Sequence, residues 1–294
     1  MKQEHSQSRR RIVLAIGALP FAASGAGAVD VEEKRTGGPY VPTPQVVVDE
    51  MLKMGRVGPD DFLVDLGSGD GVIVLTAAQR YKTRGIGVDI DPQLVHLSNS
   101  EAKKRGIADR AAFHVQDVFK ADLGKATVVT LYLLPGMMVN LRPKLLKELR
   151  PGTRVVSHDY HFGDWAADDQ YTWDVPEKEK VNGVPRATVY LWIVPASVAG
   201  KWRLELAGPG AGKYELALKQ QFQNLDGAVS GAGAKGGLKL TQSSLRGEAI
   251  TFAFPASGGR HLFKGTVSGD KMEGSVELAG GKGTVKWSAT RARS

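Results

Sequence analysis

The stretch Asp61-Phe-Leu-Val-Asp-Leu-Gly-Ser-Gly-Asp-Gly-Val-Ile-Val-Leu75 contains an apolar segment, three closely spaced glycines and a second apolar segment. This order predicts a strand, a tight turn and a helix. Gly67, Gly69 and Gly71 alternate with polar residues, and glycine permits backbone angles and a close ligand approach that a Cβ atom would prevent. The stretch therefore indicates a nucleotide-like ligand bound on the turn.

Acidic residues follow the same pattern on the neighbouring strands. Asp65 lies near the end of the first strand, Asp89 lies in the second apolar segment (85–91), and Asp117 ends the third (112–117). Asp89 comes about 20 residues after the turn, where an acidic side chain meets ribose hydroxyls. The fingerprint of dinucleotide-binding turns is G-x-G-x-x-G. Val72 stands at the position of its last glycine, so this turn departs from that fingerprint. For one aspartate alone, a strand end or a helix cap is the favoured interpretation, but three in register favour a ligand site.

This arrangement resembles the S-adenosylmethionine site of class I methyltransferases. The resemblance implies that the amino-acid end of the cofactor is bound by Asp65, Gly67, Ser68 and Gly69. It implies that the ribose is bound by Asp89 and the adenine by Asp117 with Val118.

Strand and helix patterns alternate along most of the chain. Apolar segments at 126–135 and 153–160, followed by segments at 171–175 and 187–194, predict two more strands and a closing antiparallel hairpin. We expect an α/β fold, a Rossmann-like doubly wound sheet, over residues 46–195. After a linker at 196–200, glycine-rich alternating segments over 201–294 predict a small antiparallel all-β barrel or sandwich.

A proline-rich segment precedes the first helix of the predicted sheet domain. Thr43 followed by Pro44 is typical of a helix start, with threonine as the N-cap and proline in the first turn. Tyr40 lies between prolines, so residues 29–45 form either a lid over the cofactor or a packed strap.

Residues 1–28 have the pattern of an export signal. Arg9 and Arg10 precede an apolar run (12–23) and a small-residue cleavage pattern. The paired arginines resemble a twin-arginine signal, which implies a periplasmic protein. An uncleaved inner-membrane anchor or a cytoplasmic protein with a basic tail are the alternatives. The run is short for a membrane span, so we expect no stable span after removal of the signal.

Four segments together resemble one branch of the class I enzymes: Pro39-Tyr-Val-Pro-Thr43, Val64-Asp-Leu-Gly-Ser-Gly-Asp-Gly71, Leu131-Tyr-Leu-Leu-Pro135 and Arg150-Pro-Gly-Thr-Arg-Val-Val-Ser157. This branch contains the seven-strand lysine methyltransferases of the mitochondrial ATP synthase c-subunit and adenine nucleotide translocase, with more distant similarity to non-SET histone lysine methyltransferases. The resemblance covers residues 38–195 and implies that Tyr40 and Thr43 help to enclose the cofactor.

The loop after the fourth strand is where the resemblance places the methyl acceptor. It reads Leu131-Tyr-Leu-Leu-Pro135, unlike the Asn-Pro-Pro-Tyr motif of enzymes that methylate base amines. Tyr132 and Trp165 are the candidates for an aromatic pocket that keeps a lysine amine neutral, since burial lowers the pKa of an amine. His158 and His161 lack further ligands for a metal, so we predict no metal site.

Composition narrows the function classes further. The chain has 294 residues, 42% hydrophobic residues, no cysteine and a net charge of +8. Without cysteine, thiolate chemistry and disulfides are excluded. Lysine and arginine are spread along the chain without an aromatic-interleaved basic stripe, which argues against nucleic acid.

The sequence therefore predicts a monomeric S-adenosylmethionine-dependent methyltransferase acting on a lysine of a protein, with membrane or envelope proteins among the candidates. Two alternatives remain open. One is an exported cofactor-binding fold without catalysis, whose β segment binds a partner, and the other is a small-molecule methyltransferase.

Overall fold

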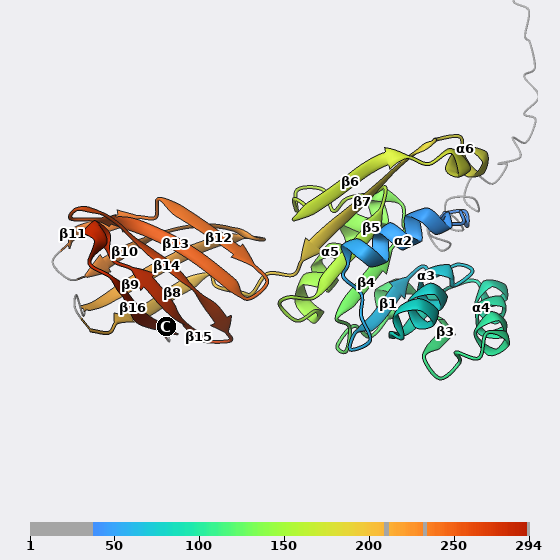
Figure 1. Ribbon diagram of the computed structural model, residues 1–294, viewed down its shortest axis with the longest axis horizontal. Coiled ribbons are helices and arrows are strands. Elements are labelled where there is room, and N and C mark those ends of the chain that lie inside the picture. Colours follow the sequence, from blue (N-terminus) through green and yellow to red (C-terminus); the bar gives the residue numbers. More distant parts are fainter. Residues whose placement is uncertain (1–37, 209–211, 232–233, 293–294) are drawn as a thin grey trace, which may run out of the picture. The chain divides into compact units, whose positions relative to one another are not determined.

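The computed structural model describes residues 38–208, 212–231 and 234–292 (Figure 1). The export-signal prediction for residues 1–28 lies outside this range, as does most of the predicted strap. Within the described part of the chain, no helix has the length and apolarity needed to cross a bilayer.

A seven-stranded mixed sheet forms the first half of the described chain, with the strand order β3-β2-β1-β4-β5-β7-β6. The first five strands in this order are parallel, and β7 and β6 are antiparallel. The predicted doubly wound sheet with a closing hairpin is confirmed. Its strands are β1 Phe62–Leu66, β2 Arg84–Asp89, β3 Ala111–Val115, β4 Val128–Leu131, β5 Arg154–His158, β6 Asp169–Asp174 and β7 Arg186–Ile193.

Successive residues of each central strand enter two different cores. Leu63 and Val128 pack with the helices of one face, whereas Val64 and Val129 pack with those of the other. This alternation follows from the two-residue repeat of a strand, and it requires apolar residues throughout because both faces are covered. The helices are α2 Gln45–Met54, α3 Val72–Thr76, α4 Pro92–Lys104, α5 Pro135–Glu148 and α6 Pro176–Asn182, with a π-helical turn at Ala77–Tyr81 and a 3₁₀ turn at Val118–Lys120.

Strands β1 and β4 are neighbours in the sheet. The chain continues from β1 to β2 and β3 toward one edge of the sheet, and from β4 to β5 toward the other edge, so the strand order reverses between β1 and β4. In open α/β sheets such a switch point leaves a crevice at the carboxyl ends of the strands, where ligands bind. The glycine turn after β1 and the loop after β4 both lie at this edge.

Helix α6 was absent from the sequence prediction. It begins with Pro176 at the first helical position and ends at Gly183, whose φ of 75° is left-handed. Proline at the start and glycine just past the end are typical helix signals, so the sequence did contain the information.

The chain after Gly200 forms a second sheet, which is entirely antiparallel. Its order is β11-β10-β9-β8-β16-β15-β14-β13-β12. It is a single curled sheet that forms a half-barrel, and it is not a sandwich of two packed sheets. Its strands are β8 Gly200–Leu206, β9 Gly212–Gln221, β10 Asn224–Gly231, β11 Ala234–Lys239, β12 Gln242–Arg246, β13 Ala249–Ala256, β14 Gly259–Ser268, β15 Lys271–Glu277 and β16 Thr284–Arg291, with a 3₁₀ turn at Ala279–Gly281.

The two ends of this sheet approach each other. Leu240 N donates to Gly227 O at 3.0 Å, and Ser243 Oγ donates to Leu225 O at 2.7 Å. Trp202, Phe252 and other apolar side chains fill the concave side. The sequence signal for β12 is weak, because this strand carries one aliphatic residue among Gln, Ser and Arg.

Candidate functional site

The turn after β1 requires glycine for two separate reasons. Gly67, Gly69 and Gly71 have φ of 80°, 51° and 79°, a region that other residues rarely adopt. A Cβ atom on Gly67 would also lie 2.7 Å from a Leu133 methyl carbon, and one on Gly69 would lie 2.7 Å from the Tyr40 ring. The turn is therefore a cradle closely covered by side chains.

Asp65 is a buried carboxylate directly before this cradle, with 2% of its surface exposed. Thr130 Oγ1 donates to Asp65 Oδ1 at 2.7 Å from the adjacent strand. Burial raises the pKa of Asp65 to about 7, the Thr130 hydrogen bond opposes the shift, and Asp89 and Asp70 raise it further. A nearby cation stabilises the negative charge of a buried carboxylate such as Asp65. The ammonium group of an amino acid is such a cation.

Asp89, at the end of β2, stabilises the cradle through hydrogen bonds. Its carboxylate accepts hydrogen bonds from Gly69 N at 2.8 Å and Asp91 N at 3.0 Å. Each carboxylate oxygen accepts more than one donor, so Asp89 retains capacity for hydroxyls. Ser68 lies in the same turn, and its buried Oγ has no hydrogen-bond partner among the described residues.

Asp117 follows β3 and starts a short 3₁₀ turn. Its Oδ1 accepts a hydrogen bond from Phe119 N at 2.9 Å. The side chain of Val118 is buried, whereas the Phe119 ring is 39% exposed. Phe119 is therefore an exposed apolar neighbour that the sequence analysis did not single out.

The segment before α2 reaches two of these loops. The Tyr40 ring lies over Gly69, and a Cβ atom on Gly38 would lie 2.7 Å from Leu134 in the loop after β4. Burial, followed by the negative charges of Asp70 and Asp89, raises the pKa of Tyr40. This geometry matches a lid more closely than a strap packed elsewhere.

The predicted N-cap at Thr43 is wrong. Pro44 occupies the N-cap position of α2 and no side chain caps it, while Pro44 O accepts from Val47 N and Val48 N. Proline has no N–H to satisfy and an extended backbone here, with φ of −58° and ψ of 143°, so the helix begins one residue later. Thr43 is half-buried beside the lid.

A second cluster lies at the carboxyl ends of β4 and β5. The rings of Tyr132 and His158 have centroids 4.0 Å apart and an interplanar angle of 32°. Tyr132 Oη lies 3.5 Å from Asn182 Nδ2 on α6. Burial, with the nearby Asp159 and Tyr160, raises the pKa of Tyr132 to about 12, so the phenol is neutral.

His158 is also neutral, because burial lowers its pKa to about 4, with Asp159 opposing the shift and Lys178 adding to it. It is 1% exposed, and Nε2 lies 3.4 Å from Asp159 Oδ2, although neither ring nitrogen makes a hydrogen bond of good geometry among the described residues. An unpaired buried polar group is costly, so His158 has the character of a functional residue.

Asp159 organises this cluster with a left-handed φ of 62°. Its carboxylate accepts from Thr188 N at 3.0 Å and from the ammonium of the buried Lys178. Lys178 Nζ also donates to Arg186 O at 2.5 Å. The sequence analysis considered His158 only as a metal ligand and missed Asp159 and Lys178, since only the fold of the β6–β7 hairpin brings α6 to β5.

Trp165 has a different role from Tyr132. It is fully buried and packs against Phe162 and Trp192, with ring centroids 5.5 and 6.0 Å away. Its indole therefore offers no surface to an acceptor and acts as core. The spacing of aromatic residues in sequence could not distinguish a core residue from a pocket wall.

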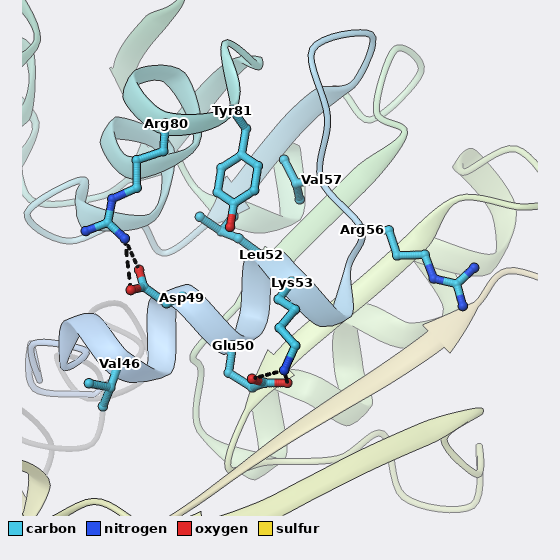
Figure 2. A pocket seen from close by; sticks show the side chains of 9 residues that line it. All are labelled: Val46, Asp49, Glu50, Leu52, Lys53, Arg56, Val57, Arg80 and Tyr81. Atoms are coloured by element: carbon cyan, nitrogen blue, oxygen red, sulfur yellow. Dashed lines mark hydrogen bonds and ion pairs between the residues drawn. The ribbon is translucent and has the colours of Figure 1, made fainter.

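No group of three potential ligands for a metal ion occurs in the described ranges. A cavity of about 370 Å³ lies beside α2 (Figure 2) and includes none of the residues above. Its charged side chains are largely paired with each other. Arg80 Nη1 lies 2.8 Å from Asp49 Oδ1, and Lys53 Nζ lies 3.0 Å from Glu50 Oε2.

The residues at the carboxyl edge fit S-adenosylmethionine. The buried Asp65 suits an ammonium group, and the cradle has no room for Cβ atoms, so its backbone is accessible at close range. Asp89 can accept further hydrogen bonds from hydroxyls, and Asp117 has a carboxylate oxygen left for an amino group. In front of this edge, the half-buried Tyr132, packed against the buried His158, forms the wall at which a methyl acceptor would lie.

Comparisons with known proteins agree with this geometry. Residues 65–169 match the family model described as ANTKMT methyltransferase domain. A protein-lysine N-methyltransferase of Saccharolobus islandicus is 40% identical over 158 residues, which are 53% of this chain and 93% of that protein. The ATP synthase c-subunit lysine N-methyltransferase of Xenopus laevis is 35% identical over 130 residues, 44% of this chain and 57% of the relative.

A solved structure also matches. It is described as an RNA methyltransferase from Salinibacter ruber in complex with S-adenosyl-L-homocysteine, is 47% identical, and aligns with a TM-score of 0.48 over 54% of this chain and 96% of that one. The archaeal enzyme is matched over nearly its whole length at 40% identity, and the chain therefore belongs to the family of S-adenosylmethionine-dependent protein-lysine N-methyltransferases.

Proposed function

We propose that this protein methylates the side-chain amine of a lysine in a membrane or envelope protein and acts as a monomer. The observation that carries the chemistry is the succession of functional groups along one sheet edge: the Asp65 carboxylate, the glycine cradle and the packed pair Tyr132–His158. The first two suit the methyl donor, and the pair suits a neutral amine.

The residues of the chain have separate tasks in this reaction. Bound S-adenosylmethionine would supply an electrophilic methyl group to a lysine amine that has already lost one proton to solvent, and the products would be S-adenosylhomocysteine and a methylammonium ion. Asp65 and the cradle hold the donor, and enclosure by Tyr40 excludes water, so catalysis comes from orientation. The Tyr132 face stabilises a cation near nitrogen.

His158 supports the acceptor surface indirectly. Its side chain is 0% exposed, so it does not touch the amine, and its ring lies 4.0 Å from that of Tyr132. We infer that His158 fixes the orientation of the Tyr132 ring, over which the amine lies with its nitrogen lone pair facing the methyl group.

The rim of the acceptor cluster supports a substrate with an apolar surface. Leu134, Val139, Val181 and Val184 are 38–51% exposed. Leu134 is in the loop of Tyr132, and Val181 and Val184 flank Asn182, which contacts Tyr132. Exposed apolar residues gathered at one site are typical of an interaction surface, here one for a lysine set in an apolar segment.

The test uses the full chain with radiolabelled S-adenosylmethionine and an array of short lysine-centred peptides, beside a matched array with arginine in place of lysine. We expect label on lysine peptides, strongest where apolar residues flank the lysine, none on the arginine array, and mass spectra showing methyllysine. Asp65→Asn is the inactive control. A folded, cofactor-binding protein that labels total RNA or small amines and no peptide would contradict the proposal.

We also propose that the protein is exported, on the basis of the pair Arg9 and Arg10 before an apolar run. Cell fractionation of the wild type and of the variant Arg9→Lys/Arg10→Lys tests this. Periplasmic protein in the wild type and cytoplasmic protein in the variant are expected; cytoplasmic protein in both would refute export.

A further inference from the structure

The edge strand β6 has free backbone groups beside the acceptor cluster. In the described part of the chain, β6 pairs only with β7, which separates it from β5 (Figure 1). Five of its six residues are exposed. Natural edge strands are commonly protected by lysine, proline or a bulge, and β6, with the sequence Asp-Gln-Tyr-Thr-Trp-Asp, contains neither lysine nor proline.

The hydrogen-bond register identifies which groups are free. Asp159 N donates to Thr188 O at 2.7 Å and Thr188 N donates to Asp159 Oδ1, so the backbone of Thr188 faces β5. Thr172 is opposite Thr188. Because bonded and non-bonded pairs alternate in antiparallel strands, Thr172 N–H and C=O point away from the sheet. Gln170 and Asp174 share this orientation, although Gln170 N donates to Asp169 Oδ1 at 2.9 Å.

The side chains of β6 favour a basic partner. Tyr171 and Trp173 stack with ring centroids 5.0 Å apart, and Tyr171 is 49% exposed. Asp174, whose side chain is 74% exposed, forms only a 3.5 Å contact with Arg186, and an exposed pair of this kind is weak. Aromatic faces and carboxylates both attract lysine and arginine side chains.

The strand also points toward the reactive edge. Tyr171 is opposite Val189, and Val189 is opposite His158, so β6 runs parallel to β5 and level with its carboxyl end. A strand added to β6 would lie three strand spacings, about 14 Å, from β5. About four extended residues at 3.3 Å each span this gap, which places the modified lysine outside the added strand.

From these contacts we propose that the lysine-bearing substrate docks by adding an extended, basic segment to β6 as an eighth strand. Its main chain pairs with Thr172, its basic side chains contact Tyr171, Trp173 and Asp174, and the modified lysine follows a few residues away at Tyr132. This inference rests on the proposed function and specifies how its protein substrate is recognised.

The test compares Thr172→Pro with the matched control Thr172→Val, using peptides that the wild type methylates. Both variants lose the 2.9 Å hydrogen bond between the hydroxyls of Thr172 and Thr188. Proline also removes the outward N–H, without breaking a backbone hydrogen bond to β7, whereas valine keeps this N–H. We expect Thr172→Pro to raise the peptide KM about tenfold, as loss of one or two hydrogen bonds predicts, with kcat and cofactor affinity unchanged, and Thr172→Val to match the wild type. Equal KM values for the two variants would overturn the inference.

A second measurement does not depend on the folding of any variant. Backbone N-methylation is scanned along a substrate peptide with the wild-type enzyme. Loss of methylation at every second position over one segment, several residues from the lysine, is expected, because a strand pairs through alternate residues. Uniform tolerance would refute strand addition while leaving lysine methylation established, and methylation of no peptide would remove the proposed function itself.

Discussion

At the scale of single residues, Asp65 combines a cost in stability with a role in binding. The free protein carries a buried carboxylate whose pKa is raised from 3.8 to about 7. This difference corresponds to about 4 kcal/mol. Because the folded state prefers the protonated form, the ionised group destabilises the free protein as pH rises from about 4 through 7.

The substitution Asp65→Asn should therefore stabilise the protein without ligand at pH 8 and leave it nearly unchanged at pH 4. The asparagine oxygen still accepts from Thr130 Oγ1. Binding of S-adenosylmethionine should be lost, and wild-type affinity should fall as pH drops below about 7. Thermal denaturation and calorimetric titration at the two pH values check this, and a destabilised variant at pH 8 would contradict it.

His158 should make the fold sensitive to acid. Its pKa is lowered from 6.5 to about 4 by burial, so the unfolded chain binds more protons between these values. Stability then falls as pH drops from 6.5 to 4, by up to about 3 kcal/mol. We expect His158→Phe, which retains a ring beside Tyr132, to flatten this acid dependence in urea unfolding. An unchanged slope between pH 7 and 4.5 would rule out this role of His158.

At the scale of elements, the lid and the glycine turn are coupled. Gly69→Ala places a Cβ atom against the Tyr40 ring at a φ of 51°, whereas Gly106→Ala meets nothing within 4 Å at a φ of 67°. Gly106→Ala should cost about 1 kcal/mol for the left-handed backbone. Gly69→Ala should cost more and weaken cofactor binding at least tenfold.

The coupling has a direct test. In the double variant Tyr40→Ala/Gly69→Ala the clash is removed, so the loss of unfolding free energy should be smaller than the sum of the single losses. Urea unfolding of the three variants measures the difference. Additive losses would show that the Tyr40 ring does not contact the turn.

Trp165 and Tyr132 should give opposite results when changed. Trp165→Phe leaves a cavity among Phe162 and Trp192 and should lower stability by about 1–3 kcal/mol with kcat nearly unchanged. Tyr132→Leu should lower kcat with little loss of stability, since Tyr132 is only half-buried. Unfolding curves beside single-turnover rates distinguish the two. A large loss of kcat in Trp165→Phe would restore Trp165 to the acceptor pocket.

The same elements show what the sequence could and could not predict. Asp65, Asp89 and the cradle glycines depend on a local strand–turn–helix pattern, which a short apolar run followed by clustered glycines reveals. The pair Tyr132–His158 depends on β4 and β5 being neighbours, and Lys178 depends on a hairpin that folds back over β5. Such long-range pairs have no local signal. Trp165 was misjudged because burial is decided by tertiary packing.

At the scale of the whole molecule, the chain contains buried clusters that share no residue across the two sheets. The buried residues of the first sheet's clusters lie within 47–194, and those of the second sheet's cluster lie within 196–289. Phe222, in the turn between β9 and β10, packs against a cluster of the first sheet. Separate cores are the physical basis of separate cooperative unfolding. The cofactor residues all belong to the first sheet and its loops.

Calorimetry of the full chain should therefore show two transitions, of which S-adenosylhomocysteine raises only one. At a hundredfold excess over its Kd the ligand adds about 2.7 kcal/mol to the unit that binds it. Phe252 is fully buried and stacks on Phe263 at 4.5 Å, so Phe252→Leu should lower only the other transition. If ligand and substitution moved one common transition, the two sheets would unfold as a single unit, and the β-rich half would contribute directly to the stability of the methyltransferase site.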